Sequence, residues 1–386
     1  MIYLDNGATT YPKPQEVQMQ MQRALREFGA NPGRSGYVMS VKTGEAVFAC
    51  RSEIADFFHA DGPECVIFQP SCTQALNLVI KGTLSRGDHV VVSDMEHNAA
   101  MRPLKKLNEQ DISFTVAKSY PGNPDLTVDS FRRAMSAQTK LIVCMHASNV
   151  LGTRFPVERL AALAHFYGAK ICVDTAQSAG VLPIDIKESG IDYICGAGHK
   201  GLYGPMGTGF LIIRRDDTLN TLIEGGTGTK SRDLNQSEDP PERYESGTQN
   251  IPGILGLHAG VRFVRKHGIE NIYRHEIMLT EYLKQALLKI DGIEVYCAEQ
   301  KPGEYVPVLS FNVEGLTSEE TAAYLAKSGI AVRAGCHCAP SAHEKIGTDT
   351  GTVRVAPSVF TKQNEINFLI RKINELVYSR KNAMRR

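Results

Sequence analysis

The chain has 386 residues, which is enough for two or three domains and a large buried core. Its 43 Lys and Arg residues almost balance 42 Asp and Glu residues, so it lacks the basic excess typical of nucleic-acid and anionic-membrane binding. The composition is that of a globular protein and not of a disordered chain. We therefore expect small molecules or specific proteins as partners, with no nucleic acid and no membrane.

The first six residues, Met1–Asn6, include an acidic residue and lack a basic and apolar leader. No apolar run reaches the length of a membrane-spanning helix. We therefore predict a cytoplasmic protein. Of the nine cysteines, Cys144, Cys172 and Cys195 lie within apolar runs, where we expect buried thiols and no disulfide framework.

Short apolar runs alternate with segments of helical periodicity between about residues 64 and 215. The candidate helices include 73–81 and 157–167, and the candidate strands are 65–68, 89–92, 141–145, 171–173, 193–195 and 210–213. Continuous apolar strands separated by helices are typical of a parallel sheet with both faces covered. The pattern therefore predicts an α/β fold with a mostly parallel central sheet flanked by helices.

The pattern changes in the segment 225–250, which is rich in Gly, Thr, Ser, Asp and Pro and reads as a long surface loop. Beyond it, amphipathic helices at 279–290 and 366–376 flank a candidate strand at 306–313 and a candidate helix at 319–327. We predict a large domain over residues 13–261 and a smaller α+β C-terminal domain over 262–386. Residues 1–12 are expected to pack on the smaller domain.

Lys200 is the first candidate catalytic residue. It lies in the segment 195–205, which follows a buried strand and contains glycines that allow a ligand to come close. A lysine at the carboxyl edge of a parallel sheet is a candidate for Schiff-base formation with a carbonyl group. The alternative is a solvated loop lysine.

Two further segments could belong to the same site. Asp174 ends another apolar strand, where it could pair with the pyridinium nitrogen of pyridoxal phosphate or cap a following helix. The segment 71–75 joins a strand to a helix, so that backbone N–H groups at Cys72 and Thr73 could bind a phosphate. Thr73 could instead serve only as a helix cap.

Seven segments in order along the chain resemble those of pyridoxal-phosphate-dependent cysteine desulfurases of the aminotransferase class V fold, a group that includes selenocysteine lyases. They are Leu4–Asn6, Glu96–Asn98, Ser148–Thr153, Asp174–Gln177, Gly198–Lys200, Glu245–Thr248 and Arg333–Ala339. The resemblance implies the type I fold of PLP-dependent transferases, with pyridoxal 5'-phosphate as cofactor. It also implies release of L-alanine from L-cysteine, or alternatively from L-selenocysteine, with sulfur left on the enzyme as a persulfide.

The resemblance also implies which residues hold the cofactor. Lys200 would bind its aldehyde, Asp174 would meet the ring nitrogen, and Gln177 would contact the phenolic oxygen. His97 would stack on the ring. The phosphate would be held at the segment of Cys72 and Thr73, by His199, and by Thr248 from the second subunit of a homodimer.

For the substrate, the resemblance implies that Asn149, Arg354 and Arg34 bind the carboxylate and that Cys338 accepts the sulfur. A sulfur-acceptor protein is then an expected partner, and iron–sulfur cluster assembly is one use of the sulfur.

Physical arguments support two of these roles. His97 follows a predicted strand by a few residues, which places it at the same sheet edge as Lys200 and Asp174, and an imidazole can both stack and carry protons near neutral pH. A purely structural histidine is the alternative. Arg354 lies in a probable strand, where its planar fork is expected to bind a carboxylate ligand or, alternatively, an internal acidic residue.

Cys338 is the candidate nucleophile. A thiolate is the reactive form, so exposure and nearby positive charge are expected, and His337 and Arg333 could supply that charge. Cys336 stands where the subgroup usually has a histidine, and this second thiol could share the sulfur or form a disulfide with release of sulfide. In a different class of function, Cys336 and Cys338 would serve a sulfur carrier or, with His337 and His343, a metal site, although we expect no metal because residues one apart on a strand point to opposite sides.

Overall fold

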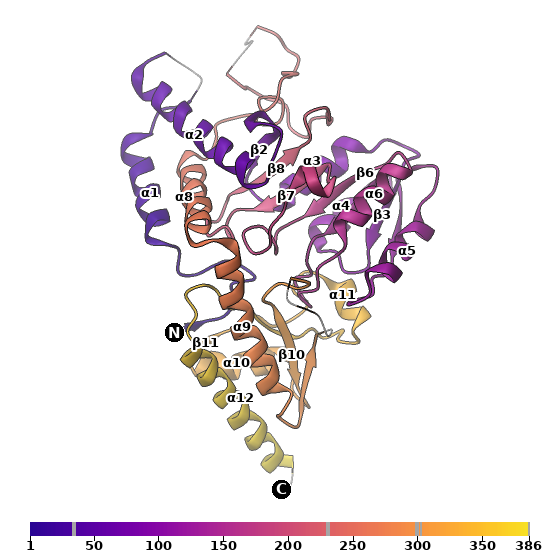
Figure 1. Cartoon of the computed structure of the whole chain (residues 1–386), viewed down its shortest axis with the longest axis vertical. Helices are drawn as coiled ribbons and strands as arrows, with labels where there is room; N and C mark the ends of the chain where they lie inside the picture. Colours follow the sequence, from indigo (N-terminus) through magenta and orange to yellow (C-terminus); the bar gives the residue numbers. More distant parts are fainter. Residues whose placement is uncertain (33–35, 229–231, 298–300, 302, 385–386) are drawn as a thin grey trace.

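The computed structural model describes residues 1–32, 36–228, 232–297, 301 and 303–384. Its central element is a seven-stranded sheet of order β2-β8-β7-β6-β5-β3-β4 (Figure 1). The strands are β2 Val66–Gln69, β3 His89–Ser93, β4 Ser113–Ala117, β5 Thr139–Met145, β6 Lys170–Asp174, β7 Tyr193–Ala197 and β8 Gly209–Ile213. Neighbours from β4 to β7 are parallel, and β8 is antiparallel to both β7 and β2. The predicted α/β class and mostly parallel sheet are confirmed.

The strands are apolar throughout because both faces of this sheet are buried. In β3, Val91 belongs to one hydrophobic core and its neighbours Val90 and Val92 belong to another. Successive side chains of a strand point to opposite faces, so each face needs its own layer of helices. The absence of polar alternation in the sequence follows from this double coverage.

Two groups of helices supply these layers. Residues of α3 Cys72–Thr83 and α4 Asn98–Asn108 pack on one face. The other core contains residues of α1 Gln15–Glu27, α2 Val38–Phe57, η1 Pro63–Cys65, α5 Pro124–Ala134, α6 Val157–Phe166, α7 Ile186–Ser189 and α8 Ile251–His267. The predicted helices at 73–81 and 157–167 are therefore observed as α3 and α6.

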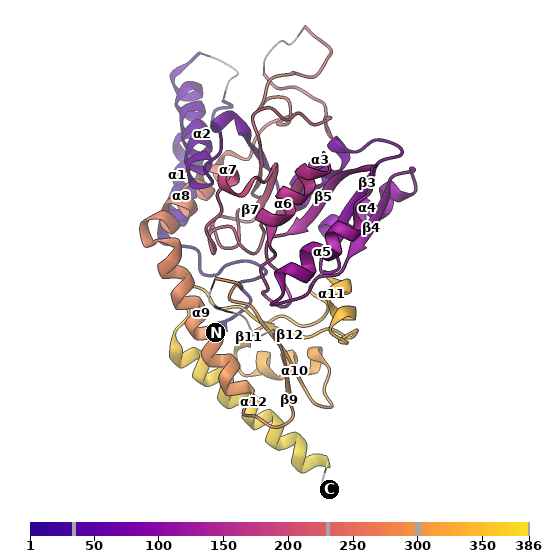
Figure 2. The ribbon, with the colours of Figure 1, turned by 45° about the vertical axis from the view of Figure 1, so that its right-hand side comes forward.

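A second, smaller unit lies below the large sheet in Figure 2. Its antiparallel sheet has the order β12-β10-β9, formed by β9 Ile293–Tyr296, β10 Leu309–Val313 and β12 Val353–Val355. Its helices are α9 Ile269–Leu287, α10 Ser318–Lys327 and α12 Gln363–Met384, whose apolar faces meet the sheet in a separate core. The predicted strand at 306–313 begins only at Leu309, because the N–H of Val306 instead donates to the carbonyl oxygen of Gly152 at 2.8 Å.

The first residues of the chain join this smaller unit. Strand β1 Ile2–Tyr3 pairs in parallel with β11 Ile330–Ala331, and Leu4 is fully buried in the same core. Gly7 and Ala8 then run toward the large sheet. The predicted boundary between residues 261 and 262 falls within α8, and the division into two domains stays a prediction.

The sequence pattern missed the two-residue strands β1 and β11 and the longer strands β4 and β9; the exposure of β4 and β9 explains why. Most residues of both are at least partly exposed, so neither shows a continuous apolar run. Within the described part of the segment 225–250 there is neither helix nor strand, in agreement with the predicted loop. Cys144, Cys172 and Cys195 are fully buried free thiols, as expected.

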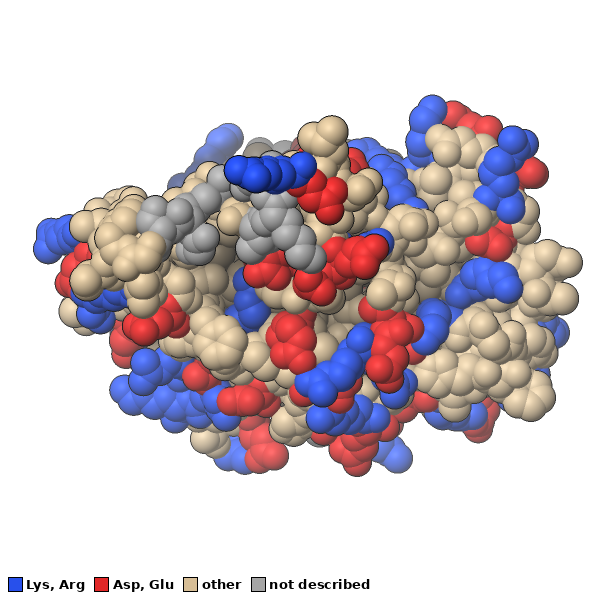
Figure 3. Space-filling view, turned by 90° about the horizontal axis from the view of Figure 1, so that it is seen from above, with Lys and Arg blue, Asp and Glu red and all other residues tan. Residues whose placement is uncertain are grey.

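The surface carries both signs of charge. Seen from above, Lys and Arg side chains are interspersed with Asp and Glu side chains and with uncharged areas (Figure 3). Among the described helices, none is both long enough and apolar enough to span a bilayer.

Leu4→Ala should lower the free energy of unfolding by about 2–5 kcal/mol, because it removes a fully buried side chain that joins β1 to the smaller core. Denaturant unfolding measures this loss. The matched control is Leu25→Ala on α1, whose side chain is 73% exposed and whose truncation should change stability by only about 0.5 kcal/mol. Equal effects of the two changes would contradict a structural role for the N-terminal strand.

Candidate active site

A cavity of about 250 Å³ lies where the carboxyl edge of the large sheet faces the smaller unit. Gly7 and Ala8 line it from the N-terminal segment. The remaining walls come from strands, helix starts and loops of both units. Most of the predicted site residues are among them: Cys72, Thr73, His97, Asn149, Asp174, Gln177, His199, Lys200, Cys338 and Arg354. Residues separated by more than 260 positions in the sequence thus share one space.

Lys200 lies three residues after the end of β7, and its amine is buried. Burial lowers its pKa from the usual lysine value, Arg354 and Arg333 act in the same direction, and Asp174 opposes them. Among the described residues, no hydrogen bond or ion pair holds the amine. Gly201 allows the turn after the lysine to close, since a Cβ there would lie 2.5 Å from the carbonyl oxygen of Ala179. The amine of Lys200 therefore has no partner among the described residues and loses its proton more readily than an ordinary lysine amine.

Asp174 is buried at the end of β6. Its Oδ1 accepts hydrogen bonds from the backbone N–H of Ala176 at 2.8 Å and from the thiol of Cys72 at 3.4 Å. Residues 176–178 form a turn and no helix follows Asp174, so its alternative role as a helix cap is wrong. The carboxylate lines the cavity together with Lys200.

His97 lines the cavity and also begins a helix. Its Nδ1 accepts a hydrogen bond from the backbone N–H of Ala99 at 3.0 Å, which makes it the N-cap of α4. Burial lowers the pKa of His97, an effect that Asp174 opposes and Lys200 strengthens. The imidazole is therefore neutral near pH 7, with its proton on Nε2 because Nδ1 acts as an acceptor.

The N-terminus of α3 forms another wall. Ser71 caps this helix, since its Oγ accepts from the N–H of Gln74 at 3.3 Å. Thr73 does not cap the helix and its side chain lies in the cavity wall. Gly209 allows β8 to approach, because a Cβ there would lie 2.6 Å from the carbonyl carbon of Ser71. The free N–H groups of a helix start favour an anion at this end of the cavity.

His199 lies close to the same cavity. Its pKa is lowered to about 4 by burial and by the neighbouring Lys200 and Lys13. Its Nδ1 is buried, and in the described part of the chain no group bonds to it. Gln177 donates from Nε2 to the carbonyl oxygen of Gly7 at 2.9 Å.

Asn149 and Arg354 lie on the side of the cavity that faces the smaller unit. Asn149 donates from Nδ2 to the carbonyl oxygen of His337 at 2.7 Å, and its buried Oδ1 finds no partner among the described residues. The Arg354 guanidinium donates to Asp5 Oδ1 and to the carbonyl oxygen of Asn149, both at 3.0 Å. The internal ion pair considered as the alternative for Arg354 is therefore present, and binding of a substrate carboxylate stays a prediction.

Cys338 lies on a tight, strained turn. His337 and Cys338 have φ angles of +48° and +59°, a left-handed conformation that is unfavourable for residues with a Cβ. The exposed thiol of Cys338 lies 3.8 Å from Nη2 of Arg333. Cys336 does not line the cavity, and its thiol lies 3.6 Å from the carbonyl oxygen of Asp349. The turn presents one thiol of the pair to the cavity.

The expectation that His337 supplies positive charge is wrong. His337 is buried with its Nε2 3.1 Å from the hydroxyl of Thr352, and burial with the nearby Arg354, His343 and Arg333 lowers its pKa to about 2. The imidazole is neutral, which leaves Arg333 as the cation beside Cys338. No group of three or more His, Cys, Asp or Glu residues in the described ranges is arranged to hold a metal ion.

Among the predicted site residues that the structure describes, Thr248 is not brought to this cavity. Thr248 lines a different cavity of about 190 Å³ with Gln74 and Gly209. Arg34 lies outside the described residues.

Sequence reasoning missed Lys13, whose ammonium donates to the carbonyl oxygen of His199 at 2.8 Å and to Thr10 Oγ1 at 2.7 Å. Burial lowers the pKa of Lys13 to about 8. No local motif marks this residue, and only its place shortly after the matching segment Leu4–Asn6 could have suggested it.

Taken together, these groups suit a ligand with an anionic group at the α3 end and a carbonyl near Lys200. The unpartnered buried atoms of Asn149 and His199 are additional places for such a ligand to bond. A reactive lysine and a carboxylate at the carboxyl edge of a mostly parallel sheet define an α/β enzyme.

Comparisons with known proteins identify its family. The model of the aminotransferase class-V family matches residues 2–369. A probable cysteine desulfurase of Methanothermobacter thermautotrophicus is 35% identical, with 97% of this chain and 94% of the relative covered. A cysteine desulfurase of Haloferax volcanii is 30% identical, with 97% and 89% covered.

A solved structure supports the same result. The apo structure of a cysteine desulfurase from Thermococcus onnurineus NA1 matches with a TM-score of 0.89 at 32% identity, covering 98% of this chain and 95% of that one. The chain belongs to the aminotransferase class-V family.

Glu96, next to His97, generates a pH-dependent prediction. It is fully buried, its Oε1 accepts from the N–H of Met145 at 3.0 Å, and burial raises its pKa from 4.5 to about 8. Below pH 4.5 the carboxyl is protonated in both folded and unfolded states. Between pH 4.5 and about 8 only the unfolded chain releases the proton, so the contribution of Glu96 to stability is lost as the pH rises.

Glu96→Gln should therefore become more stable relative to the wild type as the pH rises from 5 to 8, with a slope of at most about 1.4 kcal/mol per pH unit. Urea unfolding at several pH values measures the difference. Glu16→Gln on the exposed side of α1 is the control and should show no such slope. A flat difference for Glu96→Gln would show that Glu96 is ionised in the folded protein.

Proposed function

We propose that this chain is a cysteine desulfurase that uses pyridoxal 5'-phosphate to convert L-cysteine into L-alanine, leaving the sulfur on Cys338. The observation that carries the proposal is the single cavity lined by Lys200, Asp174 and Cys338. The names of the relatives in Methanothermobacter and Haloferax support the same activity.

The residues proposed to hold the cofactor lie along the cavity wall. Lys200 would bind the aldehyde, Asp174 the ring nitrogen, and the N-terminus of α3 with Thr73 and His199 the phosphate. Gln177 would contact the phenolic oxygen and His97 would cover the ring face. When bound, the cofactor supplies an electron sink that makes the Cα proton of an amino acid acidic.

The chain's own groups then handle the proton and the substrate. Because burial lowers the pKa of Lys200, a larger fraction of its amine is neutral near pH 7 and can accept the proton from Cα. Remaining N–H groups of Arg354 and Asn149 are proposed to bind the substrate carboxylate. The neutral His97 can exchange a proton through Nε2.

The sulfur transfer needs the thiol of Cys338, the one cysteine of the Cys336–Cys338 pair that lines the cavity. Its sulfur attacks the sulfur of the substrate, an S–S bond forms, and the C–S bond of the substrate breaks with its electron pair left on carbon. Cβ then takes up one proton, and the proton that Lys200 removed is returned to Cα, which completes L-alanine. The sum is L-cysteine plus a thiol giving L-alanine plus a persulfide, which is balanced without a further oxidant. Arg333 is the cation nearest this sulfur, with Nη2 at 3.8 Å.

The proposal extends to partners and to the organisation of the chain. A homodimer would allow Thr248 of a second subunit to reach the phosphate, and a sulfur-acceptor protein would remove the persulfide. The large unit at 13–261 and the small unit at 262–386, with residues 1–12 packed on it, would then be two domains with the substrate between them. Sedimentation analysis tests the dimer.

The experiment that tests the proposed function offers L-cysteine and L-selenocysteine separately to the holoenzyme. Alanine and the released sulfide or selenide are quantified together, and peptide mass spectrometry locates the persulfide. Equal amounts of alanine and transferred sulfur from L-cysteine are expected. Turnover of L-selenocysteine alone would identify a selenocysteine lyase, and turnover of neither would contradict the proposal.

Lys200→Ala should lose alanine formation by at least about 10³-fold, because the change removes both the amine that anchors the cofactor and the group that moves the Cα proton. Absorbance spectra of the bound cofactor and alanine release are the measurements. Lys170→Ala removes an amine at the start of β6, at the opposite end of the strand from the cavity; it is the control and should retain the spectrum of the cofactor bound to Lys200. Full activity of Lys200→Ala would remove this residue from the mechanism.

Cys338→Ala should keep the cofactor and bind L-cysteine but lose sulfide release by about 10²-fold or more. Cys336→Ala is the matched control, because it removes a thiol only two residues away. It should retain most of the activity, since the thiol of Cys336 bonds outside the cavity. Sulfide release and the position of the persulfide distinguish the two. A larger effect of Cys336→Ala would mean that the acceptor thiol is Cys336.

A further inference from the structure

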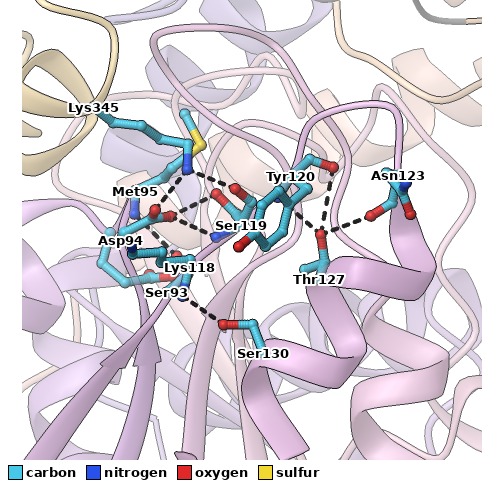
Figure 4. Close-up of polar contacts among 11 residues, drawn as sticks. Ser93, Asp94, Met95, Lys118, Ser119, Tyr120, Asn123, Thr127, Ser130 and Lys345 are labelled. Carbon is cyan, nitrogen blue, oxygen red and sulfur yellow. Dashed lines mark hydrogen bonds and ion pairs between the residues drawn. The ribbon is translucent and has the colours of Figure 1, made fainter. Parts of the chain in front are cut away.

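The segment that carries Cys338 also contacts the large unit through an ion pair whose residues do not line the cavity. Helix α11 Pro340–Lys345 begins two residues after Cys338 and ends at Lys345. The ammonium of Lys345 lies 2.6 Å from a carboxylate oxygen of Asp94, which belongs to the loop between β3 and α4. Figure 4 shows Lys345 extending from this C-terminal segment to residues at the ends of the strands of the large sheet.

Asp94 is held from two sides, so its position is well defined. Its Oδ1 accepts hydrogen bonds from the backbone N–H of Ser119 at 3.0 Å and from the Ser119 hydroxyl at 2.5 Å, which leaves Oδ2 for Lys345. The Lys345 ammonium also donates to the carbonyl oxygen of Ser119 at 2.5 Å and lies 5.8 Å from the centre of the Tyr120 ring. Lys345, Asp94 and Ser119 form one closed network of polar contacts in Figure 4, and Tyr120 lies beside it.

This network differs from an ordinary surface ion pair. The side chains of Lys345 and Asp94 are only 22% and 17% exposed, and each has more than one partner. Isolated exposed pairs hold their side chains weakly, whereas a shared network with preorganised acceptors restricts the geometry. The pair can therefore fix the end of a short helix.

The two partners belong to the two segments that bear reactive residues. Asp94 lies three residues before His97, and Lys345 lies seven residues after Cys338. Between the two segments, the N–H of Asn98 donates to the carbonyl oxygen of Cys338 at 2.8 Å, and Ala339 and Ala342 are buried in the core of the large unit. The ion pair of Lys345 with Asp94 lies at the end of this contact that is farther along the chain from Cys338.

We propose that Lys345 and Asp94 are positioning residues that hold the Cys338 thiol at the mouth of the cavity. The proposal rests on the proposed function, because the distance that is controlled is the one between Cys338 and the sulfur of the substrate. The left-handed backbone of His337 and Cys338 is unfavourable, so the segment would adopt another conformation if it were not held. The ion pair opposes that change. Neither residue lines the cavity, so neither is expected to bind cofactor or substrate.

Lys345→Met tests the ion pair, because it removes the charge and keeps most of the chain length. We expect kcat for sulfide release to fall by about 10- to 100-fold, with KM for L-cysteine and the spectrum of the bound cofactor unchanged. Lys345→Arg should restore most of the rate. Asp94→Asn, which keeps an oxygen for Ser119, should resemble Lys345→Met.

Lys372→Met is the matched control, since it breaks a 2.6 Å ion pair with Glu375 on α12, away from the cavity, and should leave kcat unchanged. Unchanged kcat in Lys345→Met, or loss of cofactor in parallel with activity, would overturn the proposal.

Amide hydrogen exchange supplies a readout that does not depend on activity. In Lys345→Met, exchange of segment 336–345 and of Asn98 should become faster, while that of β6 should not change. Faster exchange throughout the protein would indicate a merely structural role, and unchanged exchange would mean that the pair does not hold the segment. If the wild type releases no alanine, the proposed function fails, whereas the exchange measurement still decides whether the ion pair positions Cys338.

Discussion

The site depends on the burial of one amine. Lys200 is removed from water at the carboxyl edge of the sheet, where burial disfavours the charged form and the nearby Asp174 carboxylate opposes that effect. Because no ion pair within the described residues fixes the ammonium, it remains available as a nucleophile and as a base. The two arginines of the smaller unit add positive potential, which favours anionic substrates and cofactors as well as a neutral lysine.

This burial requires three parts of the chain to meet. The large sheet supplies Lys200 and Asp174 at the ends of β7 and β6, the smaller unit supplies Arg354 and Cys338, and the N-terminal segment fills the space between them. The contact of Asp5 with Arg354 joins the N-terminal segment to the smaller unit. The cavity is therefore a product of tertiary assembly, and no single unit contains it.

The sequence predicted the parts of the fold that rest on apolar periodicity. The central strands are buried on both faces and read as continuous apolar runs, and α3 and α6 follow clear start signals. Strands β4 and β9 are half-exposed, so their pairing partners and not their own residues decide that they are strands. Likewise, the loop residues of the site were found because they follow strands, and the carboxyl ends of parallel strands meet.

Other features of the site depend on contacts between distant residues and leave no local signal. The neutral state of His337 results from its burial beside Arg354, and the sequence showed only that a histidine stands next to a cysteine. The partner of Arg354 is Asp5, 349 positions away, and the contact of Lys345 with Asp94 spans 251 positions. Such pairs follow from the way the two units pack, which a single sequence does not encode in any short motif.

The path of the N-terminal segment has a practical consequence for work with this protein. Strand β1 is part of a sheet, and Gly7 and Ala8 touch the cavity only a few residues later, so a purification tag fused directly before Met1 would sit close to functional backbone. Helix α12 instead runs away from the large sheet and ends at the far tip of the molecule (Figure 1). An affinity handle or a surface-immobilisation linker is therefore better joined to the carboxyl end.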